Sequence, residues 1–265
     1  MPHLIVENFS KEKTLASHWK TFNKRGSQLV FTTDGLRFLN HQTDNSHYIN
    51  AQIDDYQHLA RRDFLWQPPL SMVVRARFSH ASGVLNGTAG FGFWNDPFLM
   101  TGLRWPALPR VVWFFYSAPP STMKLDRDTP GWGWKVGTID AQRWPFFALL
   151  PTAPLAVPLM NVDWLYQRCW PIGQRAIGVS EALVPAEMTE WHTYALYWQR
   201  DSVRFEVDGQ SILTTRSAPH GPLGFVMWLD NQYMIVSPQG NFGAGLVAKG
   251  EQQWMEVQTL TIDAP

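Results

Sequence analysis

Two seven-residue stretches of the sequence share the pattern Gly-Phe-x-x-Trp-x-Asp: GFGFWND at residues 90–96 and GFVMWLD at residues 224–230. Each stretch places a carboxylate two residues after an indole, so Asp96 and Asp230 are the candidates for acid and base chemistry. A carboxyl group in an aromatic, poorly hydrated cleft has a raised pKa, which suits a general acid. The plainer alternative is that both aspartates only begin turns, a common role for this residue type.

Strand periodicity predicts which side chains of these stretches share a face. Because successive side chains of a strand point to opposite sides, Trp94 shares a side with Asp96, and Trp228 shares a side with Asp230. The alternate positions are apolar and suit a sandwich core: Phe91, Phe93, Phe225, Met227 and Leu229. We expect the other sides to line one cleft whose ligand-binding residues are Trp94, Asn95, Trp228, Asn231 and Tyr233. Gly90 and Gly92 would leave room there for a ligand or a neighbouring indole.

The stretch GWGWK at residues 131–135 offers two further indoles on a Gly-rich segment. It predicts a loop at the rim of the cleft, where Trp132 and Trp134 stack on a ligand or pack beneath a lid. Phosphate binding is not expected, because the Gly-x-x-x-x-Gly-Lys-Ser/Thr spacing is missing. No His-Glu-x-x-His motif occurs in the sequence, so a catalytic zinc site is not indicated. No cofactor is expected.

The elements that must position these residues have the pattern of strands and turns. Strands are predicted at 26–32, 35–40, 47–53, 70–79, 88–95, 110–117, 191–199, 202–209, 210–216, 223–230 and 254–263. The Asp208-Gly209 pair joins two alternating runs and predicts a hairpin. Many short strands at this spacing indicate an all-β sandwich or barrel, with 1–265 as a single domain.

Residues 141–188 do not continue this pattern of strands and turns. They contain many prolines and apolar residues, and apolar and polar residues do not alternate along them. They predict an irregular, partly helical insertion, since a segment this long inside a sandwich is a lid or an interaction element. An apolar loop folded onto the outer sheet is the alternative. As an interaction element, the segment would join copies of the chain in a homo-oligomer.

Composition limits the classes of partner. Lys+Arg and Asp+Glu are equal at 22 each, so the whole-chain charge gives no reason to expect nucleic acid or an acidic membrane surface. No apolar run is long enough for a membrane span. The one cysteine, Cys169, excludes an intrachain disulfide. The start of the sequence has no leader pattern, which predicts a cytoplasmic protein, or a secreted one if a leader has been removed.

Two further stretches carry a family resemblance. WHTYALYWQRDSVRFEVDGQSI at residues 191–212 and FLWQPPLSMVVRARFS at residues 64–79 resemble strands of the concanavalin A-like sandwiches, in particular the family 16 glycoside hydrolases (laminarinases and lichenases). The resemblance covers about residues 4–263, apart from the 141–188 segment. It implies a two-sheet antiparallel jelly-roll sandwich with adjacent terminal strands, and a structural calcium held by Glu7 and Asp263.

Catalytic members of that family carry Glu-x-Asp-x-Glu on a central strand, because a retaining glycosidase needs two carboxyl groups about 5 Å apart. The corresponding stretch here, RVVWFFYS at residues 110–117, contains no acid, so the family's catalytic residues cannot be carried over.

Three functions remain open. The chain binds a glycan or another hydroxyl-bearing ligand in an aromatic cleft, without the standard hydrolytic groups. Alternatively, it is an atypical glycoside hydrolase-like enzyme that uses Asp96 and Asp230, with Tyr233 or His80, as acid and base. The third possibility is an apolar small molecule held beneath the 141–188 lid, which a Pro-punctuated apolar insertion would suit.

Overall fold

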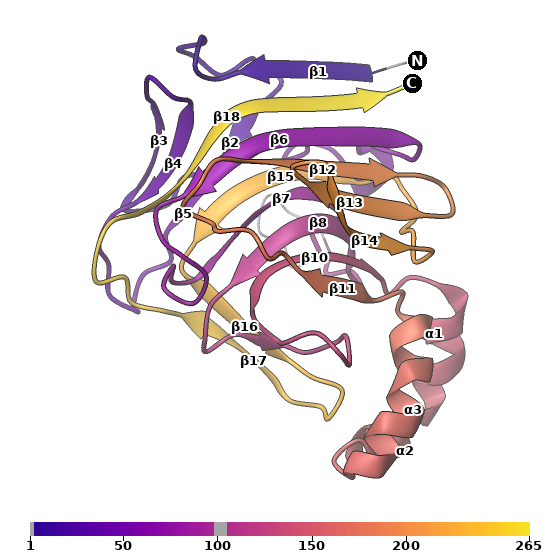
Figure 1. Cartoon of the computed structure of the whole chain (residues 1–265). Helices are drawn as coiled ribbons and strands as arrows, with labels where there is room; N and C mark the ends of the chain where they lie inside the picture. The colour runs from indigo at the N-terminus through magenta and orange to yellow at the C-terminus, as the bar shows by residue number, and fades with distance from the viewer. Residues whose placement is uncertain (1–2, 98–104) are drawn as a thin grey trace.

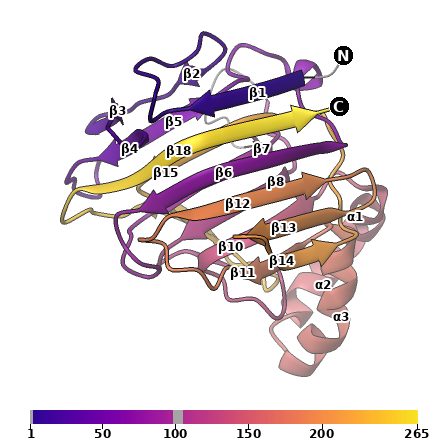
Figure 2. The ribbon, with the colours of Figure 1, turned by 45° about the horizontal axis from the view of Figure 1, so that its top comes forward.

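Two large β-sheets packed face to face form the body of the molecule (Figures 1 and 2). The computed structural model describes residues 3–97 and 105–265. In spatial order, the first sheet consists of β14 (Gln210–Thr215), β13 (Val203–Val207), β12 (His192–Trp198), β6 (Leu70–Phe78), β18 (Gln253–Ala264), β4 (Leu36–Asn40) and β3 (Ser27–Phe31), and β1 (His3–Asn8) also pairs with β18.

The second sheet carries both Gly-Phe-x-x-Trp-x-Asp stretches. Its strands, in spatial order, are β11 (Ser180–Leu183), β10 (Gly133–Asp140), β8 (Arg110–Ser117), β7 (Thr88–Trp94), β15 (Gly224–Asp230), β5 (Asn50–Asp54) and β2 (Lys20–Thr21). A small third sheet contains β17 (Phe242–Leu246), β16 (Gln232–Val236) and β9 (Thr122–Met123). Among the described strands, only the β16–β9 pairing is parallel. The predicted all-β, two-sheet antiparallel jelly-roll sandwich is confirmed.

Alternating side chains build the core between the two sheets. Along β6, every second residue from Leu70 to Phe78 is buried and the others are partly exposed, as expected for a strand with one face on a core. We refer to residues 90–96 and 224–230 as the twin stretches. The five apolar residues that they were predicted to contribute to the core all lie between the sheets. At the hairpin between β13 and β14, Asp208 and Gly209 both have positive φ, the backbone that a two-residue hairpin turn requires.

The chain ends lie side by side, as predicted, because β1 pairs antiparallel with β18 (Figure 2). On the outer face of the same sheet, the fully buried carboxylate of Glu256 accepts hydrogen bonds from Arg37 and Arg77 at 2.9 and 2.8 Å. Burial alone would raise the pKa of Glu256, but hydrogen bonds from Arg77 and Thr32 and the charges of both arginines hold it below its ordinary value. This ion-pair cluster ties β4, β6 and β18 together.

The 141–188 segment is more regular than predicted. It forms α1 (Trp144–Leu149), the short 3₁₀ turn η2 (Leu150–Thr152), α2 (Ala153–Leu159) and α3 (Asp163–Ala176), and then returns to the sheet as β11. The helices project from one corner of the sandwich, away from both chain ends (Figures 1 and 2). None of the described helices has the length and apolar character needed to cross a bilayer. A further 3₁₀ turn, η1 (Arg61–Asp63), precedes β6.

Candidate functional site

The twin stretches lie next to each other, because β7 and β15 pair antiparallel along their full lengths. In this register Gly90 faces Trp228, and Gly224 faces Trp94. The two indoles therefore meet on the outer face of the seven-stranded sheet, where their planes are 7° from parallel and their centroids 6.4 Å apart. That separation is within the range of offset aromatic stacking.

Two glycines of β7 make room for these rings. A Cβ on Gly90 would lie 2.9 Å from a ring atom of Trp228 and 2.3 Å from a backbone oxygen of β8, both closer than a carbon atom tolerates. Gly92 has a φ of 152°, and a Cβ there would lie 2.6 Å from Trp113. Gly90 thus makes room for the neighbouring indole of Trp228, as expected, whereas Gly92 makes room for the backbone and Cβ of Trp113 on β8.

Strand registers place the outward side chains of this face in cross-strand rows over β8, β7, β15 and β5. One row is polar and contains Ser117, Thr88, Asp230 and Asn50. The next row is mainly aromatic and contains Phe115, Gly90, Trp228 and Gln52. A third row contains Trp113, Gly92, Val226 and Asp54. The face thus changes from aromatic to polar toward the end where Asp230 lies.

A cavity of about 310 Å³ opens over these rows. Residues of β9 and of the β16–β17 hairpin line one side of the cavity. Figure 1 shows this hairpin below β15. The described lining residues are Tyr48, Gln52, Thr88, Trp94, Trp113, Phe115, Met123, Val226, Trp228, Asp230, Gln232, Tyr233, Met234, Phe242 and Ala244. No described residue of the 141–188 segment is among them, so the insertion does not cover this cavity.

Asp230 is the carboxylate at the polar end of the cavity. One of its oxygens accepts hydrogen bonds from the Thr88 hydroxyl at 2.7 Å and from the Gln232 N–H at 3.1 Å. The same hydroxyl accepts the indole N–H of Trp228 at 2.9 Å. Burial raises the pKa of Asp230 to about 6, against the lowering effect of these hydrogen bonds. The carboxylate is therefore held in place and titrates close to neutral pH.

A buried lysine accompanies this carboxylate. Lys249 is fully buried, and its Nζ makes no hydrogen bond to any described residue. Burial lowers the pKa of Lys249 to about 7, although the nearby charge of Asp230 opposes this shift. Ser117 Oγ and Asn50 Oδ1, both in the polar row, are also buried without a described partner. Buried polar atoms of this kind are usually satisfied by water. None of these three residues is among those that line the cavity, where Thr88 and Asp230 are the members of the polar row.

The structure separates the two predicted acid–base residues. Because the strands run antiparallel, Asp230 is level with Thr88, whereas Asp96 follows Trp94 at the far end of β7. The six residue steps from Thr88 to Trp94 span roughly 20 Å at about 3.3 Å per step. Asp96 is fully buried in a turn with a φ of 45° and does not line the cavity. The two aspartates therefore cannot act on one bond.

Both predicted asparagines have structural contacts instead of facing the cavity. Asn95 is buried, and its amide group bonds the backbone of Leu108 and Arg110 at 2.9 Å. Asn231 is fully buried, and its side chain bonds backbone groups of His47, Ile49 and Val247, which belong to two separate segments. Each residue follows a strand end, where an amide satisfies loop backbone groups.

The remaining predicted residues divide between the cavity and other places. Trp94, Trp228 and Tyr233 line the cavity, although each of the two indoles is only 8% exposed. Trp134 does not: it lies on β10 with its ring between the sheets, against Phe91 and others. Trp132 is 41% exposed outside the cavity lining. His80 is not among the lining residues and pairs with Glu251.

Several cavity residues were not predicted from the sequence. Trp113 and Phe115 could have been found, because they alternate on the acid-free strand 110–117, with Val111 on the same face. Gln52 follows from the same alternation on β5. Lys249 lies in the loop before β18 and does not line the cavity, although its charge acts on Asp230; the sequence contains no signal that would have placed it there.

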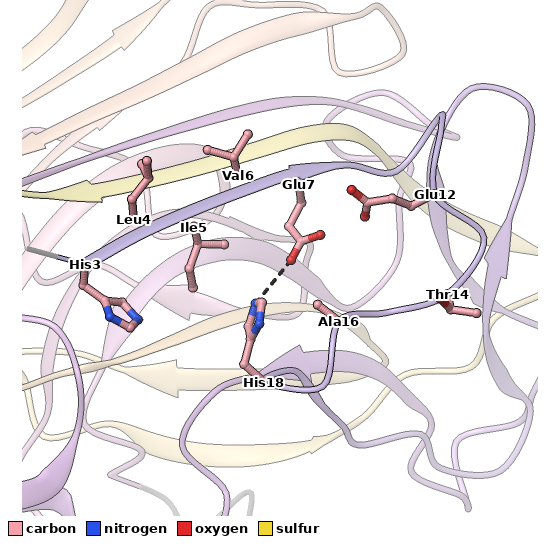
Figure 3. Close-up of a pocket in the computed structure, with 9 residues that line it drawn as sticks. All are labelled: His3, Leu4, Ile5, Val6, Glu7, Glu12, Thr14, Ala16 and His18. Atoms are coloured by element: carbon pink, nitrogen blue, oxygen red, sulfur yellow. Dashed lines mark ion pairs between the residues drawn. The ribbon is translucent and has the colours of Figure 1, made fainter.

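Glu7 and Asp263, the expected calcium ligands, face opposite sides of the sheet. Glu7 is buried toward the core, whereas Asp263 is exposed and lies opposite Leu4. The Glu7 carboxylate instead faces His18, 3.2 Å away, in a groove beside β1 (Figure 3), and it accepts the Trp19 N–H at 2.9 Å. No group of three or more His, Cys, Asp or Glu residues suited to a metal occurs among the described residues.

Comparison with solved structures identifies the architecture. The chain is similar to a Bacillus licheniformis β-glucanase (10% identity, TM-score 0.51, 99% of this chain and 98% of that chain). It is also similar to an endo-1,3-β-glucanase from Streptomyces sioyaensis (13%, 0.50, 100% and 97%) and to a GlcNAcα1-4Gal-releasing endo-β-galactosidase from Clostridium perfringens (14%, 0.53, 98% and 62%). No family model and no curated protein matches the sequence. The chain has the concanavalin A-like fold of these glycoside hydrolases, as the sequence resemblance implied.

Proposed function

We propose that the chain binds a short carbohydrate in the cavity of the seven-stranded sheet. The observation that carries the proposal is the change from an aromatic to a polar surface within one cavity. Trp113, Phe115 and Trp228 offer apolar contact area to the C–H faces of a sugar ring. Thr88 and Asp230 lie beside them and orient hydroxyl groups. Ligand sites typically combine an apolar lining with a few placed polar groups in this way.

The size of the cavity supports a small ligand. A volume of about 310 Å³ is at the lower end of the range of small-molecule sites. The structural neighbours are named as glucanases and a galactosidase, which supports carbohydrate as the ligand class.

Binding is favoured over hydrolysis by the number of carboxylates. Both retaining and inverting glycosidases use two carboxyl groups, about 5 to 9.5 Å apart. Asp230 is the one carboxylate among the described residues that line the cavity. On the β8 side of the site, the outward residues that line the cavity are Trp113 and Phe115, neither of which can act as an acid or a base.

Isothermal titration calorimetry with laminaritriose, cellotriose and N-acetyllactosamine tests this proposal. We expect at least one of the three to bind, and Trp228→Ala to weaken that binding at least tenfold, because the variant removes the ring from the middle of the site. Trp132→Ala is the matched control, since it removes an indole outside the cavity, and it should change the Kd less than twofold. Circular dichroism checks that both variants remain folded.

Two results would overturn the proposal. One is saccharide binding that Trp228→Ala leaves unchanged, which would place the site elsewhere. The other is binding of an apolar probe such as 1-anilinonaphthalene-8-sulfonate in the cavity, with none of the three saccharides bound. Incubation with laminarin and lichenan is expected to release no reducing sugar. Release that Asp230→Asn abolishes would replace binding by catalysis.

A further inference from the structure

The helical protrusion formed by α1, η2, α2 and α3 carries a concentration of exposed apolar side chains. Eight of the sixteen large apolar residues exposed in the described parts of the chain lie on it: Trp144, Phe147, Leu150, Leu155, Leu159, Val162, Trp164 and Ile172. Trp144 and Leu155 are each 78% exposed. Exposed apolar surface that is gathered in one place marks an interaction site.

The charge pattern of the protrusion changes along the chain. No charged residue occurs between Trp144 and Val162, and the following helix then presents Trp164, Arg168, Ile172 and Arg175 at helical spacing on its exposed side. Arg143 precedes the uncharged stretch, and Asp163 is the one acid from 143 to 176. The net charge of the whole chain is zero, but this segment is locally basic. Arginines beside aromatic and aliphatic groups are typical of helices that lie in a membrane interface.

The starts of the helices in the protrusion have few unpaired backbone N–H groups, which suits an apolar environment. Pro145, Pro151 and Pro154 occupy the first positions of α1, η2 and α2, where an N–H would have no partner within the helix. Proline has no N–H, so these helix starts present fewer unsatisfied donors. This lowers the cost of moving the segment out of water, because an unpaired backbone donor is expensive in hydrocarbon.

We propose that this protrusion docks the protein on a bilayer surface with anionic headgroups. The stretch from α1 to α2 enters the interface, and Arg168 and Arg175 bind headgroup phosphates. A bilayer fits better than a second copy of the chain, because apolar groups are exposed on more than one side: the neighbours Leu150 and Pro151 are both exposed, and so are Pro154 and Leu155. A partner protein would cover one side of such a turn, whereas lipid surrounds it. The position at a corner of the sandwich (Figures 1 and 2) leaves the approach free.

Flotation of the full chain with lipid vesicles tests the proposal. We expect binding to vesicles of phosphatidylcholine with about a third phosphatidylserine, and at least tenfold weaker binding to phosphatidylcholine alone, since each arginine near an anionic surface contributes roughly fivefold. Leu155→Ser/Leu159→Ser should lower binding to the anionic vesicles at least tenfold. Leu4→Ser/Val84→Ser is the matched control, because it removes two exposed apolar residues of the sandwich, and it should leave binding unchanged. Arg168→Gln/Arg175→Gln should abolish the preference for phosphatidylserine.

The single cysteine gives an independent readout. Cys169 is exposed on α3, so an environment-sensitive fluorophore attached there should shift to the blue when anionic vesicles are added. The same label on Cys169→Ser/Ser211→Cys, which moves it to β14 on the sandwich, should not shift.

Three outcomes would overturn the proposal: no flotation with anionic vesicles, equal flotation of both leucine-to-serine and control pairs, or a dimer in light scattering that Leu155→Ser/Leu159→Ser dissociates while vesicles are not bound. The last result would assign the surface to a second copy of the chain. The saccharide titrations address a different site, so the two proposals can fail separately.

Discussion

Replacing Lys249 by methionine should change how stability depends on pH. The amine is fully buried, and burial lowers its pKa from 10.5 to about 7. Between these two pH values the unfolded chain binds a proton that the folded protein does not, so the free energy of unfolding rises with pH across this window. The contribution is at most about 1.4 kcal/mol per pH unit, or about 4 kcal/mol over three units.

Methionine removes the titrating group and keeps a similar side-chain volume. A volume-conserving core substitution usually costs less than about 1.5 kcal/mol, and this cost does not depend on pH. We therefore expect Lys249→Met to be the more stable protein near pH 7, with the difference shrinking toward pH 10. The useful quantity is the change in this difference with pH, because the other titrating groups are common to both proteins.

Urea unfolding followed by tryptophan fluorescence, at steps of half a pH unit from pH 7 to 10, measures this difference. Lys124→Met is the matched control, since Lys124 is exposed, and its curve should run parallel to that of the wild type. Parallel curves for Lys249→Met as well would refute the reasoning, because they would mean that the buried amine is not desolvated. The amine near Asp230 would then stay protonated over most of this pH range.

Three further substitutions test the packing at the site and two buried carboxylates elsewhere in the fold. Gly90→Ala should destabilise the fold by about 1–3 kcal/mol in urea, because its Cβ would overlap Trp228 and overpacking costs that much; an unchanged midpoint would contradict the close approach. Glu256→Gln should lower the free energy of unfolding by about 3 kcal/mol, since it leaves two arginines without their buried counter-charge; a loss under 1 kcal/mol would show that solvent screens the pairs. Burial raises the pKa of Glu7 to about 7, so the wild type should lose stability as pH rises from 4.5 to 7, whereas Glu7→Gln should not; thermal scans with equal pH slopes would exclude this.

Alternation made most of the fold predictable from the sequence. Every one of the eleven predicted stretches contains a strand. The alternation of side chains along the twin stretches correctly assigned Phe91 and Phe225 to the core, and Trp94 and Trp228 to the outer face. The strand β10 was missed because the glycines of GWGWK suggested a loop. That error put Trp134 at a cleft rim, although its ring packs between the sheets.

The site was less predictable, because spatial neighbours depend on the order and direction of strands. The alternation of side chains placed both Asp96 and Asp230 on the side facing the cleft. The antiparallel register, however, puts them at opposite ends of the β7–β15 pair. Lys249 reaches the site from a loop, where no periodicity applies. The helices of the 141–188 segment were hidden by their prolines. Pro145, Pro151 and Pro154 lie in the first turns, whereas Pro158 and Pro171 lie inside helices.

The pairing of the twin stretches has a consequence for how a ligand would be oriented. Position one of each stretch faces position five of the other, and Gly92 faces Val226 at position three, so a local two-fold axis passes between β7 and β15. The Trp94–Trp228 pair follows this symmetry, so by itself it presents the same surface to a sugar chain running in either direction. The flanking strands break the symmetry, because β8 contributes Trp113 and Phe115 where β5 contributes Gln52 and Asp54. The aspartates break it as well, because Asp230 lines the cavity and Asp96 does not. Under the proposed function, Asp230 and its polar row thus define which end of the ligand points where.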